Sequence, residues 1–363
     1  MLADKSPQAK GKRMTMKTLT TSLSLIALLA TGLATAKAGE VTVAVGGGVI
    51  QEVGRETLWG PAGKTLNLTV KEETINDAYA AVKLQAAANA VTYDLVQTNA
   101  FQAEKGGREG LFLPLDYGVI DKKDFIEGTA QKYCISALIF SWVMAWNKDT
   151  YAGNEPKSWA DFWDVEKFPG KRAMRNDPEA QLEIALLADG VPMDKVYEVL
   201  QSEGGLKRAL DKIEQLKPHI AVWWNSGAQH AQLMKDKEVD MSVGWNARFE
   251  AVKKDGAPVD YTFNQGIMSM DCWAVPAGAP HAADAMRMIN EMSKPEAQAK
   301  FSVGVKYGAA NKRAYETGLI PDDVSKKLPT YPDNAKSQLA QQNEWWVEHI
   351  EEAQLGFQDL MSR

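Results

Sequence analysis

Short apolar runs alternate with helix-like stretches along the chain from residue 40 onward. Residues 40–45 (EVTVAV) alternate polar and apolar side chains, as a half-buried strand does, and the glycines at 46–48 follow directly. Further strands are predicted at 66–70 and 93–97, and the Ala-rich stretch 77–89 between them predicts a helix. This order of strands and helices predicts a parallel sheet that is covered by helices.

The same rhythm continues after the apolar run 135–146 (ISALIFSWVMAW), which we interpret as a buried strand pair near the end of a first domain. Strands are predicted at 171–174, 220–224, 239–245 and 272–276. With helices between the first three, a second α/β unit fills roughly residues 140–270. No internal repeat or low-complexity linker separates the two units, so we expect the chain to cross between them on strands that form a hinge.

Residues 1–38 have the features of a secretory signal peptide. A basic start is followed by the apolar stretch 19–33 and then by small residues that suit signal peptidase. A cut after Ala38 is favoured, with Ala36 as the alternative. The apolar stretch is too short to span a bilayer, and no second one is long enough. We therefore expect an exported protein that is released in soluble form.

Length and charge narrow the class of protein further. The 363 residues exceed one ordinary core and suit two domains. Residues 1–38 carry six of the 41 basic residues and one of the 47 acidic residues, so the exported chain keeps 35 and 46, a net charge of −11. This acidic excess disfavours nucleic acid as a partner, because binding to phosphates needs an excess of Lys and Arg.

The familiar motifs of catalysis are absent from the sequence. It has no G-x-S-x-G elbow, no H-E-x-x-H and no phosphate-binding G-x-x-x-x-G-K-[ST], and its four histidines lack the spacing of metal ligands. The glycines at 46–48 do not complete a dinucleotide fingerprint. We therefore expect no catalytic residue, no metal and no cofactor. The two cysteines, Cys134 and Cys272, are either buried small side chains or one bridge in an oxidising compartment, and the residues alone leave both open.

Several segments together point to a family. They are SWADFWD (158–164) with FPGKR (168–172), KPHI (217–220) with WWNSGAQ (223–229), VGWNAR (243–248), MDCWAVP (270–276) and YGAAN (307–311). In this order they resemble the periplasmic solute-binding proteins of ABC importers, in the spermidine/putrescine-type branch that includes γ-aminobutyrate-type binders. The resemblance implies an α/β, two-lobed periplasmic binding protein fold of type II, in which each lobe is a mainly parallel sheet covered by helices and crossing strands join the lobes.

The resemblance also implies how the chain is divided and what it does. Lobe 1 would comprise 39–138 and 271–318, and lobe 2 would comprise 139–270 and 319–363. A small amine-bearing solute would close the lobes, and the closed protein, expected to be a monomer, would deliver it to the membrane permease of an ABC importer. An exported enzyme that uses the same cleft is an alternative, as is a protein that presents its ligand to a receptor.

Three residues carry the expectation about the ligand. In polyamine-type members an acid in the segment that matches 270–273 holds an ammonium group, and Asp271 fits that position. Trp245 matches an aromatic wall of the family's site. Arg248 departs from the polyamine pattern and is similar to the γ-aminobutyrate-type subgroup, because a guanidinium repels a polycation and pairs with a carboxylate. Two ligand classes therefore remain open, a zwitterion whose ends are held by Arg248 and Asp271, and a polyamine. The alternative role for Arg248 is a surface ion pair that does not contact the ligand.

The remaining site candidates come from strand ends. Trp224 and Ser226 lie at a strand-to-helix junction, where α/β proteins place ligands, and Gly47 and Gly48 are the candidates on the opposite lobe. Under the implied fold Cys134 and Cys272 both fall near the crossing strands, so we hypothesise a disulfide beside the hinge. Trp159, Trp163, Trp345 and Trp346 are interpreted as structural.

Overall fold

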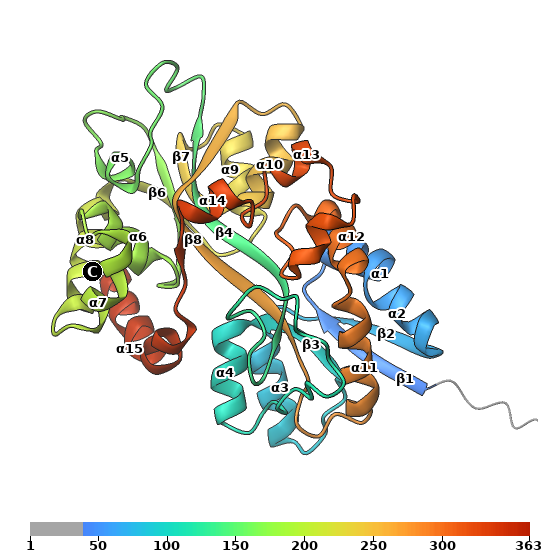
Figure 1. The fold of residues 1–363 in the computed structure, drawn as a ribbon. Helices are drawn as coiled ribbons and strands as arrows, with labels where there is room; N and C mark the ends of the chain where they lie inside the picture. Colours follow the sequence, from blue (N-terminus) through green and yellow to red (C-terminus); the bar gives the residue numbers. More distant parts are fainter. Residues whose placement is uncertain (1–38) are drawn as a thin grey trace, which may run out of the picture. The chain divides into compact units, whose positions relative to one another are not determined.

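A nine-stranded sheet runs through residues 39–363, which the computed structural model describes; the signal peptide predicted at 1–38 lies outside them. The strands are β1 (Gly39–Val45), β2 (Leu68–Thr74), β3 (Leu95–Asn99), β4 (Ile135–Asn147), β5 (Arg172–Arg175), β6 (Ile220–Trp224), β7 (Met241–Trp245), β8 (Val259–Ala274) and β9 (Leu339–Ala340). Their order is β2-β1-β3-β8-β4-β7-β5-β6, and β9 pairs with β8 (Figure 1).

Helices connect the strands and pack against the sheet (Figure 1). They are α1 (Val49–Thr57), α2 (Trp59–Leu66), α3 (Ala78–Ala87), α4 (Ala100–Arg108), α5 (Trp159–Trp163), α6 (Gln181–Ala188), α7 (Val196–Gln201), α8 (Gly205–Leu216), α9 (Gln229–Lys235), α10 (Asn246–Lys254), α11 (Ala282–Met292), α12 (Pro295–Val305), α13 (Asp322–Ser325), α14 (Pro332–Lys336) and α15 (Asn343–Ser362). Three 3₁₀ turns lie at Met193–Lys195, Lys217–His219 and Lys312–Glu316.

Two groups of parallel strands flank a central antiparallel pair. In the first lobe β1 pairs with β2 and β3, and α1–α4, α11 and α12 pack around them. In the second lobe β5 pairs with β6 and β7, and α5–α10 pack around them. The long strands β4 and β8 pair with each other and join the two groups. The predicted α/β fold, with mainly parallel strands in each lobe and crossing strands between them, is confirmed.

The prediction of a strand pair at 135–146 was wrong. The run forms β4, a single strand of 13 residues that are all buried. Because β7 and β8 pair with its two edges, and helices and loops cover its faces, the strand is apolar at nearly every position and shows no alternation. The run 135–146 contains no Gly, Pro, Asn or Asp, and that absence marks one strand rather than two.

The strand predicted at 272–276 is only the end of β8, which begins at Val259. An irregularity in the middle of β8 explains why its first half was missed. Gln265 has a left-handed backbone (φ 58°), and the register with β4 shifts nearby. Trp159 fixes this irregular segment, since its backbone N–H donates to Gln265 Oε1 (3.1 Å) and its indole N–H donates to the Gln265 carbonyl (2.8 Å).

The last helix, α15, contacts both lobes. It packs against α4 of the first lobe and α8 of the second. Its Trp346 ring lies 6.0 Å from the ring of Phe101, and its indole N–H donates to Glu183 Oε1 in α6 (2.7 Å). Between residues 39 and 363, none of the helices combines the length and the apolar character that crossing a bilayer requires.

Cys134 and Cys272 form a disulfide, with their Cα atoms 5.6 Å apart. Cys134 directly precedes β4, and Cys272 lies near the end of β8 opposite Ser136. The bridge therefore ties the two crossing strands together at their first-lobe ends. Both cysteines are fully buried, so the bond lies within the core.

Removing this bridge should destabilise the protein. The disulfide joins residues 138 positions apart, so its loss gives the unfolded chain much more freedom. We expect the double variant Cys134→Ser/Cys272→Ser to lose about 2–4 kcal/mol of unfolding free energy in urea titrations. Reductant should shift the unsubstituted protein in the same direction and leave the double variant unchanged. Equal urea midpoints for the two proteins would contradict a stabilising bridge.

Candidate functional site

The pleat of the β4–β8 pair separates two cavities. Leu138 pairs with Asp271, and Ile139 pairs with Met270, so neighbouring side chains point to opposite faces. Leu138 and Asp271 face a cavity of about 560 Å³, which we call the cleft cavity. Ile139 and Met270 face a cavity of about 660 Å³ on the other side, which we call the rear cavity.

The cleft cavity is the better candidate site although it is the smaller one. Its charged lining residues are Asp77, Arg175, Asp177, Glu179, Arg248 and Asp271, its aromatic ones are Phe101, Phe140, Trp142, Trp245 and Tyr307, and its amides are Asn76, Gln97, Asn99, Gln102 and Gln354. They come from both lobes and have both signs of charge. The lining of the rear cavity includes no cation, and two of its acids, Glu104 and Glu344, are paired with Arg108. Opposite charges around an aromatic cavity are what an orienting small-molecule site needs.

Asp271, Arg248, Trp245 and Gly47 all line the cleft cavity. Asp271 comes from β8, Trp245 ends β7, and Arg248 lies one turn into α10. The sequence placed these residues far apart, and the fold brings them to one cavity because the ends of β7 and β8 lie against the same stretch of β4.

Trp224, Ser226 and Gly48 do not line the cleft cavity. Trp224 has no exposed surface, and it stacks on Trp142 with ring centroids 6.1 Å apart. Its ring lies 5.6 Å from the ring of Trp245, which does line the cavity and packs so closely over Gly227 that a Cβ there would come within 2.3 Å of the indole. Ser226 and Gly48 are exposed beside the cavity, and Gly227 lines it instead of Ser226.

Aromatic rings form one wall of the cavity. The Trp245 ring lies 5.1 Å from Trp142 and 6.4 Å from Phe140, and Phe140 lies 6.2 Å from Tyr307. The guanidinium carbon of Arg175 lies 5.1 Å from the centre of the Trp142 ring. Such a surface suits both a methylene chain and a cationic group.

Behind this wall stands His230, which is fully buried 4.7 Å from the Trp224 ring and 4.8 Å from Phe249. Burial lowers the pKa of His230 to about 3, so its imidazole is neutral. Among residues 39–363, no group of three or more His, Cys, Asp or Glu side chains is arranged to hold a metal ion. His230 therefore supports the aromatic wall by packing.

The charged groups of the cavity fall into a paired set and an unpaired set. Arg175 donates to Glu179 at 3.0 Å and lies 4.0 Å from Asp177. Within the described chain, the Arg248 guanidinium makes neither a hydrogen bond nor an ion pair. The Asp271 carboxylate accepts only one hydrogen bond, from the Gln97 amide at 3.3 Å. Arg248 and two acids, Asp271 and the exposed Asp77 that caps α3, thus line the cavity without a charged partner of their own, and only Arg248 and Asp271 are shielded from solvent in part.

The surroundings of Asp271 disfavour the ionised form of its carboxyl group. Burial raises the pKa of Asp271 to about 7, and the nearby negative charge of Glu179 acts in the same direction, while the Gln97 hydrogen bond opposes it. Burial also raises the pKa of Glu179, against the attraction of Arg175. A cation placed beside Asp271 would favour its ionised form and lower its pKa.

Sequence reasoning missed Arg175, Asp177 and Glu179. Arg175 is the last residue of β5, and Asp177 and Glu179 follow it in the stretch RNDPE; β5 lies in the middle of the parallel strands of the second lobe. A charged cluster at the carboxyl end of a parallel strand was the signal that could have found them. Phe140 and Trp142 gave no such signal, because both lie inside a continuous apolar run.

Two α/β lobes joined by crossing strands, with a charged and aromatic cavity between them, define a solute-binding protein of the two-lobed type. A family model described as bacterial extracellular solute-binding protein matches residues 62–333, and the chain belongs to that family. The chain is 34% identical over 344 residues to the gamma-aminobutyric acid-binding protein of Pseudomonas aeruginosa, covering 94% of this chain and 96% of that protein.

Two further relatives differ in what their names say they bind. Spermidine/putrescine-binding periplasmic protein 1 of Haemophilus influenzae is 25% identical over 272 residues, 72% of each chain. The crystal structure of the binding protein MotA from A. tumefaciens B6 in complex with glucopine is 38% identical, with a TM-score of 0.83, covering 88% of this chain and 99% of that one. These similarities confirm the predicted family and fold.

The raised pKa of Asp271 predicts how stability depends on pH. The pKa is about 7 in the folded protein, against about 3.9 in an unfolded chain, so the folded state loses stability as pH rises between these values and no further above 7. Between pH 5 and pH 8 the ligand-free protein should lose on the order of 2 kcal/mol more unfolding free energy than the Asp271→Asn variant loses.

Thermal unfolding at the two pH values measures this difference. The control is Asp194→Asn, an exposed acid outside the cavity, which should follow the unsubstituted protein. If Asp271→Asn and the unsubstituted protein lose the same stability between pH 5 and pH 8, the carboxylate is not held in an unfavourable environment.

Proposed function

We propose that this protein captures a small zwitterionic solute, with an amino group at one end and a carboxylate at the other, in the cleft cavity. The observation that carries the proposal is the pair of unmatched opposite charges, Arg248 and Asp271, on the same cavity. A γ-aminobutyrate-like ligand would supply the missing cation to Asp271 and the missing anion to Arg248. Both protein charges would then be paired inside a site that excludes water.

The roles of the lining residues follow from their chemistry. The Asp271 carboxylate would accept hydrogen bonds from the ligand ammonium, with Gln97 holding the carboxylate in place. The Arg248 guanidinium would donate two parallel hydrogen bonds to the ligand carboxylate. Trp245 and Trp142 would cover the methylene chain between the two ends.

Similar proteins support this choice of ligand class. The P. aeruginosa relative, named for gamma-aminobutyric acid, is similar over nearly the whole chain. A larger amino-acid conjugate is a second candidate, because the MotA relative was crystallised with glucopine and the cavity has several amides beyond those that a short zwitterion needs. A cavity of about 560 Å³ accommodates either size.

A polyamine is the weaker alternative. Two guanidinium groups, those of Arg175 and Arg248, line the cavity, and only Arg175 is neutralised by acids of its own loop. The uncompensated charge of Arg248 would repel the second ammonium group of a diamine. The polyamine-binding relative is also less similar to this chain than the gamma-aminobutyric acid-binding one.

The setting of this activity rests on the family. Export through a signal peptide cut after Ala38 would deliver a monomer to the periplasm. There the lobes, with boundaries near 138, 270 and 318, would close on the solute, and the closed form would dock on the permease of an ABC importer. Closure would be driven by the ligand's stronger contacts with the closed form, in which residues of both lobes reach it.

Titration calorimetry with γ-aminobutyrate and with putrescine tests the proposal. We expect γ-aminobutyrate to bind the unsubstituted protein and putrescine to bind weakly or not at all. A larger amino-acid conjugate that binds more tightly than γ-aminobutyrate would favour the second candidate. If neither a zwitterion nor a conjugate binds, and putrescine does, the proposed ligand class is wrong.

Substituting Arg248 separates the ligand classes. We expect Arg248→Ala to weaken γ-aminobutyrate binding about 100-fold or more, because the ligand carboxylate would be left buried without a partner. Arg248→Lys should recover part of the loss, since an ammonium group keeps the charge but not the bidentate geometry. Putrescine binding should be spared or improved in Arg248→Ala.

The matched control is Lys254→Ala, which removes an exposed positive charge from the same helix outside the cavity. It should leave both affinities unchanged. Equal γ-aminobutyrate affinities for Arg248→Ala and Lys254→Ala would show that Arg248 does not contact the solute.

A further inference from the structure

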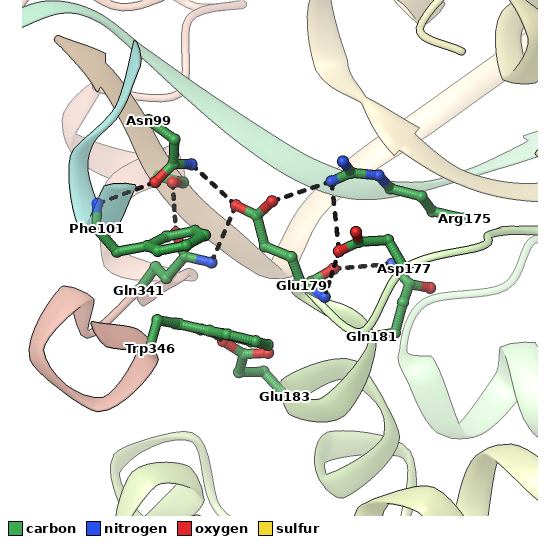
Figure 2. A network of polar contacts seen from close by, with 10 residues as sticks. Asn99, Phe101, Arg175, Asp177, Glu179, Gln181, Glu183, Gln341 and Trp346 are labelled. Atoms are coloured by element: carbon green, nitrogen blue, oxygen red, sulfur yellow. Dashed lines mark hydrogen bonds and ion pairs between the residues drawn. The ribbon is translucent and has the colours of Figure 1, made fainter. Parts of the chain in front are cut away.

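Glu179 lines the cleft cavity, and its carboxylate accepts hydrogen bonds from three separate segments (Figure 2). Its Oε2 accepts a hydrogen bond from Arg175 at 3.0 Å. Its Oε1 accepts one from the Asn99 amide at 3.0 Å and a longer one, 3.5 Å, from the Gln341 amide. The three donors lie on the second lobe, the first lobe and the segment that leads into α15.

The bond between Asn99 and Glu179 crosses from one lobe to the other. Asn99 ends β3 in the first lobe, and its side-chain oxygen also accepts from the Phe101 backbone N–H at the start of α4 (3.0 Å). The amide is therefore held at both of its ends. Glu179 is only 7% exposed, so the contact is shielded from water, where a hydrogen bond to a charged acceptor is strong.

The loop that presents Glu179 has a constrained backbone. The Glu179 backbone N–H donates to Asp177 Oδ1 at 2.9 Å, and Ala180, the next residue, has a left-handed backbone with φ 64°. An alanine in this region is strained, and such strain persists only where the surroundings enforce it. The strained turn fixes the direction in which the Glu179 side chain leaves the chain.

The third donor links Glu179 to the crossing strands. Gln341 also accepts a hydrogen bond from the Ser269 hydroxyl (2.6 Å), and its backbone N–H donates to the Met268 carbonyl (2.9 Å). Both of these residues belong to β8, which continues to Asp271. Glu179 is thus connected to both lobes and to a strand that joins them.

We propose that Glu179 is a latch between the lobes, which holds Asn99 of the first lobe against the second and at the same time orients Arg175 over the aromatic wall of the cleft. The part of this proposal that concerns Arg175 rests on the proposed function, because it assumes that the carboxylate end of a solute lies near that wall. The latch itself concerns the ligand-free protein. It favours the approach of the lobes before the solute binds, so that less of the binding free energy goes into closure.

The latch is tested by measuring the distance between the lobes without any ligand. Spin labels at Leu84→Cys in α3 and Lys207→Cys in α8 report on the two lobes from exposed positions, since Leu84 is 74% exposed and the Lys207 side chain 77%. The native cysteines are bridged and buried and do not take up label. Double electron–electron resonance then gives the distribution of label distances.

Asn99→Ala removes the amide that crosses between the lobes. We expect a second population of label distances. Its ratio to the main population should be about tenfold higher than in the unsubstituted protein, because a hydrogen bond to a charged group is lost. Glu179→Gln should shift the distribution in the same direction, because a neutral acceptor binds the Asn99 amide less strongly. In the Asn99→Ala background, Glu179→Gln should change the distance distribution little further, since the amide whose bond it weakens is already removed.

The matched control is Asn76→Ala, which removes the amide of another first-lobe asparagine that lines the same cavity. It should leave the distance distribution unchanged. If Asn99→Ala gives the distribution of the unsubstituted protein, the latch does not exist, whatever the protein binds. If the latch variants shift the distribution but γ-aminobutyrate and related solutes fail to bind, the latch stands and the proposed function is the part that fails.

Discussion

The antiparallel pairing of β4 with β8 is the constraint on which the cleft cavity depends. These strands join the lobes, and the disulfide between Cys134 and Cys272 ties them together at one end. Their register places Asp271 opposite Leu138, on the face of the cleft cavity, and sends Ile139 and Met270 to the rear. A shift of one residue would turn Asp271 away from the cleft.

In the cleft cavity some charged side chains are paired with each other, and others have no charged partner. Arg175 and Glu179 are bonded to one another, and Glu179 extends this pairing across the lobes to Asn99. Arg248 and Asp271 have no charged partner, and burial together with the negative charge of Glu179 raises the pKa of Asp271. The paired charges would organise the cavity, and the unpaired charges would select what enters it.

The sequence predicted the architecture well, because alternating strands and helices are local patterns. It also predicted Asp271, Arg248 and Trp245 as site residues through segments that resemble a family, and all three line the cleft cavity. It missed Arg175 and Glu179, because their place in the cavity depends on the order of strands β7, β5 and β6. It favoured Trp224 and Ser226 because both lie at the end of a strand, where α/β proteins generally place ligands. Side-chain packing instead puts Trp245 at the cleft cavity and Trp224 behind it.

The central claim is that Arg248 and Asp271 hold the two ends of one solute. A crystal structure of the protein grown with γ-aminobutyrate tests it most directly. The account predicts the ligand nitrogen within hydrogen-bond distance of the Asp271 carboxylate, the ligand carboxylate against the Arg248 guanidinium, and the methylene chain along Trp245. A ligand in the opposite orientation, or one bound outside the cleft cavity, would contradict it.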